Sequence, residues 1–276
     1  MWYVSKVSGT QFVPWLLPLG VCPPILSLFE SKIATMELKK ASYDDAPEMT
    51  EEDLMRKVLS TEKGAVWIEL GCGGAKVAQV LAKAHPEISI YAYEVDEKQL
   101  EKNLALPSLP SNLKIGKAGM QDFPAENGSV DAVVMLKSLH HVPKQDMEDG
   151  FARIKDALKP GGKLFVCEPV FGGDFNEILR TFHDEEEVRS HAFNVLKGHV
   201  ETGFFELEQE IHFQSRSTFP QGYKDFEERI MGSTFNNFSL TDDVVQTVRE
   251  KFQQHEKEDG SAEFMMPLRA NILVKK

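Results

Sequence analysis

VWIELGCGGA, at Val66–Ala75, is an apolar run that ends in an acid and a glycine turn, and a helical pattern follows from Lys76 to His85. This change of pattern across glycines indicates a strand, a tight loop and a helix. Gly71 and Gly73 allow backbone angles closed to other residues and let a ligand approach the main chain, where the helix start offers unpaired N–H groups. The segment is typical of a nucleotide-type binding site.

The residue two positions before the first glycine indicates which ligand is bound. A dinucleotide loop has the form Gly-x-Gly-x-x-Gly, but the third glycine would fall on Lys76. The carboxylate of Glu69 instead suits a ligand with a cationic amino group and no pyrophosphate. S-adenosyl-L-methionine is such a ligand.

Glu69-Leu70-Gly71-Cys72-Gly73 resembles the first motif of the class I S-adenosylmethionine-dependent methyltransferases, with Ala75 in place of the last glycine of the motif. The turn Leu158-Lys159-Pro160-Gly161-Gly162 is a further match. The matches extend from Val66 to Pro169 and resemble the small-molecule branch of the family. The resemblance implies an α/β fold: a Rossmann-like, doubly wound, seven-stranded sheet, mostly parallel, with an antiparallel last strand and helical cap insertions.

The run Ile88–Glu94 is a second predicted strand, and Glu94 lies 23 residues after Gly71. An acid at about this spacing receives the ribose hydroxyls in strand-helix-strand nucleotide folds. We therefore assign Glu94 to the ribose and include Val95 in the cofactor site. A surface acid at a strand end is the alternative.

The loop after a third predicted strand, Leu113–Lys117, corresponds to the adenine region of the resembled family. Many members carry an aspartate where Gly119 stands, so a side-chain contact to the adenine amino group is in doubt. We assign Met120 to the purine face and give Asp122 a neighbouring polar role.

A buried strand is predicted at Val130–Leu136, and Lys137-Ser138-Leu139-His140-His141 follows it. Ligands of open α/β sheets bind beyond the carboxyl ends of the strands, so the reactive methyl group is expected near this segment. Lys137 is assigned to the cofactor site. His140 or His141 is a candidate base for a hydroxyl or amine proton, because the histidine pKa lies near neutral pH. The alternative is that both histidines only shape the pocket; Glu168 is a weaker base candidate.

The charge and the cysteine content limit the partners, the metal sites and the compartment that the sequence predicts. A net charge of −12 and a pI near 5.2 disfavour nucleic acid. The three cysteines, Cys22, Cys72 and Cys167, show no paired or metal-like spacing, which favours a reducing compartment and predicts no metal site. We interpret Cys72 as a small filler of the glycine loop and expect a cytoplasmic protein.

Residues 1–36 differ in composition from the rest of the chain. The run from Phe12 to Phe29 is apolar, but four prolines interrupt it, and a membrane span needs about 20 continuous apolar residues. The four prolines therefore argue against a membrane span. The segment is an extension without fold or function, an organellar or secretory targeting sequence, or a part that docks on the domain; Met36 would be an ordinary cytosolic start.

The methyltransferase domain is expected at residues 37–276, with substrate-cap segments at about 172–200 and 216–258. Helix starts are predicted from three capping boxes, at Thr50, Asp96 with Gln99, and Asp184 with Glu187. Five aromatic residues either line an apolar acceptor pocket or belong to plain core: Phe219, Tyr223, Phe226, Phe235 and Phe238. Surface roles are expected for His183 and Arg216.

The predicted reaction is in-line transfer of a methyl group from S-adenosylmethionine to a small, partly apolar acceptor. Alignment of donor and acceptor supplies most of the catalysis, without a metal or covalent nucleophile. Two alternatives remain open: aminopropyl transfer from decarboxylated S-adenosylmethionine, and an inactive methyltransferase-like scaffold. The acceptor atom and the oligomeric state are open.

Overall fold

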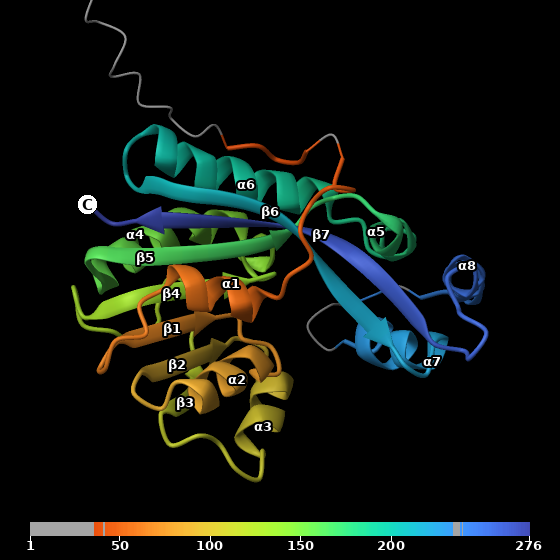
Figure 1. Cartoon of the computed structure of the whole chain (residues 1–276), viewed down its shortest axis with the longest axis horizontal. Coiled ribbons are helices and arrows are strands. Elements are labelled where there is room, and N and C mark those ends of the chain that lie inside the picture. The colour runs from red at the N-terminus through yellow and green to blue at the C-terminus, as the bar shows by residue number, and fades with distance from the viewer. Residues whose placement is uncertain (1–35, 41, 234–237, 239) are drawn as a thin grey trace, which may run out of the picture. The chain divides into compact units, whose positions relative to one another are not determined.

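A computed structural model describes residues 36–40, 42–233, 238 and 240–276, and Ala34–Lys276 forms one compact unit. The described residues build a seven-stranded sheet in the order β3-β2-β1-β4-β5-β7-β6 (Figure 1). The first five strands are parallel, and β7 is antiparallel to both of its neighbours, which confirms the predicted fold. The strands are β1 (Val66–Leu70), β2 (Ser89–Glu94), β3 (Leu113–Lys117), β4 (Val130–Leu136), β5 (Leu158–Pro169), β6 (Glu206–Phe219) and β7 (Ala262–Val274).

Eight α-helices connect or extend these strands: α1 (Glu51–Val58), α2 (Lys76–Ala84), α3 (Glu97–Leu104), α4 (Met147–Ala157), α5 (Asp174–Leu179), α6 (Glu186–Glu201), α7 (Tyr223–Phe226) and α8 (Asp242–Gln253), counted over the described residues. Thr50 caps α1 as predicted, by accepting the N–H of Asp53. Asp96 caps α3 as predicted, and its side chain accepts the N–H of Lys98. The N-cap of α6 is Glu185 rather than Asp184.

The sheet separates two hydrophobic clusters. Buried residues of α1 and α2 pack with one face, and buried residues of α4 and α6 pack with the other. In α6 these residues are Ala192, Phe193 and Leu196, whose spacing places them on one side of the helix. Helix α6, which we assigned to the substrate cap, is therefore mainly a core helix.

β6 and β7 extend together past the other strands toward α7 and α8 (Figure 1). The π-helical turn η3 (Glu227–Met231) follows α7. These elements and α5 enclose a third hydrophobic cluster, which includes Ile178, Phe219, Phe226 and Phe252. The cap predicted from residues 216–258 is thus an insertion in the β6–β7 hairpin, and it packs on α5.

The segment before α1 lies along the last two strands. Pro47 and Met49 exchange backbone hydrogen bonds with Gln214 of β6, at 2.9 and 3.0 Å. Met36, placed by our prediction in the N-terminal extension, is 5% exposed in the core, so the folded unit already includes it. The remaining predictions for residues 1–35 lie outside the described residues. Along the described part of the chain, no helix has the length and apolar character that crossing a bilayer requires.

Candidate active site

The glycine loop connects β1 to α2 and needs glycine at its first position. Gly71 has φ of +69° and Gly73 has φ of +49°. A Cβ atom at Gly71 would lie 2.7 Å from Cβ of Ser138, whereas one at Gly73 would meet no atom within 4 Å. The loop therefore packs against the segment after β4 at Gly71 and leaves room for a ligand at Gly73.

Glu94, at the end of β2, holds the glycine loop. Its Oε2 accepts the N–H of Gly73 at 2.7 Å, and its Oε1 accepts the N–H groups of Val95 and Asp96 at 2.8 and 2.9 Å. From α3, Nδ2 of Asn103 donates to the carbonyl oxygen of Gly73 at 2.6 Å. The loop is thus fixed from both sides. The ribose role of Glu94 and the cofactor role of the exposed Val95 stay predictions.

Glu69 and Lys137 lie at neighbouring strand ends. Glu69 is 6% exposed, and burial raises the pKa of its carboxyl group to about 8, since the charged form loses its hydration. Lys137 follows β4 with φ of +53°, and its Nζ forms an ion pair with the Glu51 carboxylate of α1. Their assignments to the cofactor stay predictions.

Two further predicted residues are buried. Met120 is 3% exposed and packs under α4, where a Cβ at Gly150 would lie 2.6 Å from its Cγ. Its adenine contact stays a prediction. Burial raises the pKa of the Cys72 thiol, which disfavours the reactive thiolate. Asp122 accepts the N–H of Gly119 at 2.7 Å and so closes its own loop.

A cavity of about 300 Å³ lies beyond the carboxyl ends of β4 and β5. Helix α5, the turn η3, the first turn of α6 and the middle of β7 form the rest of its wall. One part of the wall is apolar, with Val170, Phe175, Leu179, Ile230, Phe238 and Met266. Another is polar, with His140, His141, His183 and Glu185.

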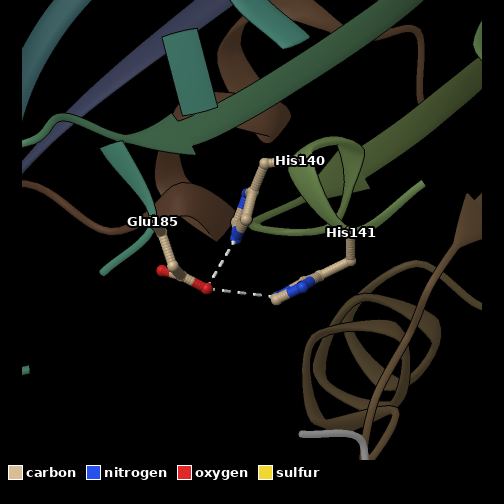
Figure 2. Close-up of side chains that lie close together, drawn as sticks. All are labelled: His140, His141 and Glu185. Carbon is tan, nitrogen blue, oxygen red and sulfur yellow. Dashed lines mark ion pairs between the residues drawn. The ribbon is translucent and has the colours of Figure 1, made fainter. Parts of the chain in front are cut away.

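The polar part gathers three imidazole rings around one carboxylate oxygen. Oε1 of Glu185 lies 3.5 Å from Nε2 of His140, 3.9 Å from Nε2 of His141 and 2.8 Å from Nε2 of His183. Figure 2 shows His140 and His141 directed at this oxygen from the same short turn. The other oxygen of Glu185 binds Nη2 of Arg189, one helical turn further along α6.

The carboxylate of Glu168 fixes His140 from the other side of the ring. Its Oε2 contacts Nδ1 of His140, and its Oε1 accepts the N–H groups of Ser138 and Leu139 at 3.1 and 2.9 Å. Glu168 is 4% exposed and has these partners already. It therefore positions His140 and is not placed to act as the base that we considered from the sequence.

The surroundings of the two histidines shift their pKa values in opposite directions. Burial alone would lower the pKa of His140, but the adjacent carboxylates of Glu168 and Glu185 raise it to about 9. Burial and the neighbouring charge of His140 lower the pKa of His141 to about 4. The pKa of Glu185 is lowered despite burial, because His140 and Arg189 stabilise its charge. The two carboxylates thus favour the charged form of His140, whereas burial favours the neutral form of His141.

The structure corrects one assignment made for the cap, that of His183, and decides between the alternatives left open for the aromatic residues. His183, expected at the surface, is in the cavity wall beside Glu185, whereas Arg216 forms exposed ion pairs with Glu48 and Glu263. Phe219, Tyr223 and Phe226 are core residues. Phe238 does line the cavity. Phe235 lies outside the described residues.

Sequence reasoning missed Glu185 and Arg189 as residues of the site. Their i, i+4 spacing at a helix start is a recognisable acid–base pair, but such pairs are common on exposed helix surfaces. Both are buried here, at 5% and 8% exposure, because the first turn of α6 faces the segment after β4. Nothing in the local sequence indicates that contact.

A doubly wound sheet with a glycine loop after β1, and a cavity beyond the carboxyl ends of its strands, is the arrangement of a nucleotide-binding α/β domain. Residues 68–162 match the family model described as a methyltransferase domain. Residues 68–162 are thus similar to a methyltransferase domain, and the sheet has the fold of a solved methyltransferase-like structure.

Two curated relatives are O-methyltransferases. The chain is 30% identical over 151 residues to O-methyltransferase rstn1 of Aspergillus nomiae, a match that covers 51% of this chain and 65% of the relative. It is 32% identical over 106 residues to a ubiquinone biosynthesis O-methyltransferase of Xanthomonas axonopodis, covering 37% of this chain and 42% of the relative. The match thus spans less than two thirds of either relative.

Solved structures agree on the fold. A candidate methyltransferase from Bacillus halodurans superposes with a TM-score of 0.55 at 16% identity, covering 82% of this chain and 98% of that one. The [4+2]-cyclase SpnF superposes with a TM-score of 0.50 at 17% identity, covering 81% and 79%. Because one of these neighbours is named a cyclase, the fold alone does not identify the reaction.

Proposed function

We propose that the protein transfers a methyl group from S-adenosylmethionine to a hydroxyl oxygen of a small, partly apolar molecule. One observation carries the proposal: a single short segment contacts both the glycine loop and the cavity. Oγ of Ser138 donates to the carbonyl oxygen of Leu70 at 2.8 Å, next to Gly71, while His140 and His141 line the cavity. Both relatives named above are O-methyltransferases, which favours oxygen as the acceptor atom.

The residues around the glycine loop fit the proposed cofactor. When bound, S-adenosylmethionine supplies an electrophilic methyl group on a positively charged sulfur. Gly73 leaves room for a ligand beside the first turn of α2, and Glu94 is fixed next to it. We assign Glu69 to the ammonium group and Glu94 to the ribose. Met120 is assigned to the adenine.

The cavity would hold and orient the acceptor. Its apolar wall excludes water from the reacting atoms, and its polar part receives the hydroxyl group. The new C–O bond forms as the C–S bond breaks, and the hydroxyl proton passes to the group of His140, His141 and Glu185. Positioning of the two reactants in this way can supply several kcal/mol of the barrier reduction, up to about 7–11 kcal/mol.

Calorimetric titration of the full chain with S-adenosylhomocysteine, S-adenosylmethionine and NAD tests the cofactor. We expect both sulfur compounds to bind and NAD not to bind. Glu94→Ala should weaken binding by about tenfold or more, since it removes the group that holds the loop; an effect of about 1.4 kcal/mol is a factor of ten. The control is Glu97→Ala, which alters an exposed acid that pairs only with Lys117.

Incubation with labelled S-adenosylmethionine and a panel of phenolic and aliphatic hydroxyl compounds tests the transfer. Leu179→Trp, which fills the apolar part of the cavity, should abolish methylation and leave S-adenosylhomocysteine binding intact. Cofactor binding without methylation of any acceptor would favour the scaffold alternative. A chain that binds neither sulfur compound would refute the proposal.

A further inference from the structure

The group of His140, His141 and Glu185 has the composition of a metal site. Each residue offers one donor atom, and the three atoms lie within 4.8 Å of one another. Two histidines and one glutamate, with a further position left open, form the ligand set of a class of catalytic zinc sites. The set does not appear in the spacing of the sequence because Glu185 is 44 residues beyond His141.

The distances in the group match those between ligands of one ion. Oε1 of Glu185 is 3.5 Å from Nε2 of His140 and 3.9 Å from Nε2 of His141. Two ligands of a tetrahedral zinc ion, each about 2.0–2.1 Å from the metal, lie about 3.4 Å apart. Oε1 of Glu185 is therefore within about half an ångström of this spacing from each histidine, and all three donor atoms lie within 4.8 Å of one another. Nitrogen donors disfavour Mg²⁺ and Ca²⁺, which prefer oxygen.

The neighbours of these residues are those that a metal site requires. Ligating histidines usually donate their other ring N–H to a carboxylate, which fixes the ring and its tautomer. His140 has this partner in Glu168, which is itself held by two backbone N–H groups. Glu185 has its second oxygen bound by Arg189, so only Oε1 is directed at the histidines. Both ligands are thus oriented before an ion binds.

We propose that His140, His141 and Glu185 bind one divalent transition-metal ion of the zinc type, with its open coordination position directed into the acceptor cavity. All three residues line that cavity, so a molecule in it can reach the ion directly. His183, whose Nε2 is 2.8 Å from Oε1 of Glu185, lies beside the carboxylate and stays outside the ligand set. The proposal departs from the sequence-based expectation that the protein has no metal site.

The consequence for the reaction rests on the proposed function. A hydroxyl oxygen bound to a divalent cation loses its proton at much lower pH, as water does on zinc. With the ion bound, His140, His141 and Glu185 are its ligands, so the proton leaves to solvent water and not to these three residues. The resulting oxygen anion then forms the C–O bond as the C–S bond of S-adenosylmethionine breaks. The ion would select acceptors with a hydroxyl group, or two adjacent oxygens, over apolar or amine acceptors.

Cobalt binding tests the site without an activity assay. The full chain is freed of metal with a chelator and titrated with Co²⁺, which has visible absorption bands that strengthen in tetrahedral sites. We expect one Co²⁺ per chain, displaced by Zn²⁺. His141→Ala and Glu185→Gln should weaken Co²⁺ binding by about 100-fold or more, and Glu168→Gln by about 10–100-fold. His255→Asn is the control. His255 lies outside the cavity wall, and its Nδ1 is 3.9 Å from the carboxylate of Asp174, so it is a histidine beside an acid but not part of the proposed site.

Titration of the same samples with S-adenosylhomocysteine separates this proposal from the proposed function and shows that each variant is folded. A wild-type chain that binds S-adenosylhomocysteine but gives no Co²⁺ absorption would overturn the metal site and leave methyl transfer standing. Equal Co²⁺ affinity in His141→Ala, Glu185→Gln and wild type would overturn it as well. Co²⁺ binding as expected without S-adenosylhomocysteine binding would support the site and refute the methyltransferase proposal.

Discussion

Glu69 is a buried acid at the end of the first strand, and its titration links stability to pH. Its pKa is raised to about 8 by burial, whereas a Glu carboxyl group in an unfolded chain titrates near about 4.3. The unfolded state therefore releases this proton at lower pH than the folded state does. The contribution of Glu69 to stability is fully present below the unfolded pKa and is lost as the pH rises toward 8.

Glu69→Gln should remove this part of the pH dependence. Between about pH 5 and about pH 7.5, the free energy of unfolding of the wild type should fall by on the order of 3 kcal/mol more than that of the variant. Urea denaturation at the two pH values measures both changes. Parallel pH profiles of the two proteins would show that Glu69 is already ionised in the folded state.

Replacing the two glycines of the loop by alanine should have different effects on stability and on cofactor binding. In Gly71→Ala the new methyl group would lie 2.7 Å from Cβ of Ser138 and the backbone is left-handed, so the unfolding free energy should fall by about 2–4 kcal/mol. Gly73→Ala adds only the left-handed strain, about 1 kcal/mol. Its methyl group points into the space assigned to the cofactor, so it should weaken S-adenosylhomocysteine binding more than stability. Denaturation and calorimetry together would contradict this if both variants behave alike.

At the scale of elements, the sequence predicts the sheet well and the cavity poorly. β1 to β4 are identified within a residue or so, because each is a short apolar run between turn residues. The apolar alternation of β6 ends near Phe213, but the strand continues to Phe219 through a polar run whose backbone pairs with β7 and whose Arg216 forms an ion pair with Glu263 of β7. The cavity joins residues from β4, β5, α5, α6 and the β6–β7 insertion, and no local pattern encodes which of these distant segments meet.

The β6–β7 insertion should be able to unfold locally while the sheet and the glycine loop stay folded. Its hydrophobic cluster is separate from the two clusters that cover the sheet. Phe252 is fully buried there, with its ring centroid 5.0 Å from that of Phe226 and 5.7 Å from that of Phe219. Phe252→Ala should lower the stability of this cluster by about 3–5 kcal/mol. We expect faster hydrogen exchange in residues 219–233 and 240–264, loss of acceptor turnover, and retained S-adenosylhomocysteine binding.

Phe151→Ala is the matched control for that prediction. Phe151 is equally buried but lies in the cluster between α4 and the sheet. Loss of the Phe151 ring should lower the free energy of cooperative unfolding of the whole domain and speed hydrogen exchange in the strands. If Phe252→Ala also abolishes S-adenosylhomocysteine binding, the insertion and the sheet form one cooperative unit.

At the scale of the whole folded unit, the segment before α1 joins the start of the described chain to its last two strands. Arg269 of β7 is 3% exposed: its Nη1 donates to the carbonyl oxygen of Leu38 at 2.7 Å, its Nε donates to Asn271 at 3.0 Å, and its guanidinium lies over the ring of Phe193 of α6. One side chain therefore ties three distant parts of the sequence together. The residues that make these contacts are far apart in the sequence, so no local sequence pattern indicates them.

Arg269→Leu should destabilise the whole unit, because it leaves buried acceptors of the N-terminal segment and of β7 without a donor. Removing one member of such a buried charged network costs about 3–5 kcal/mol, which corresponds to a fall in Tm of about 10 °C for a domain of this size. Arg216→Ala is the control: Arg216 joins the same segment to β6 through Glu48, but its side chain is 43% exposed, and water can replace the lost contacts. Thermal unfolding followed by circular dichroism should show a large shift for Arg269→Leu and little change for Arg216→Ala. Equal shifts would mean that the segment is held by its backbone pairing with Gln214 and not by the buried arginine.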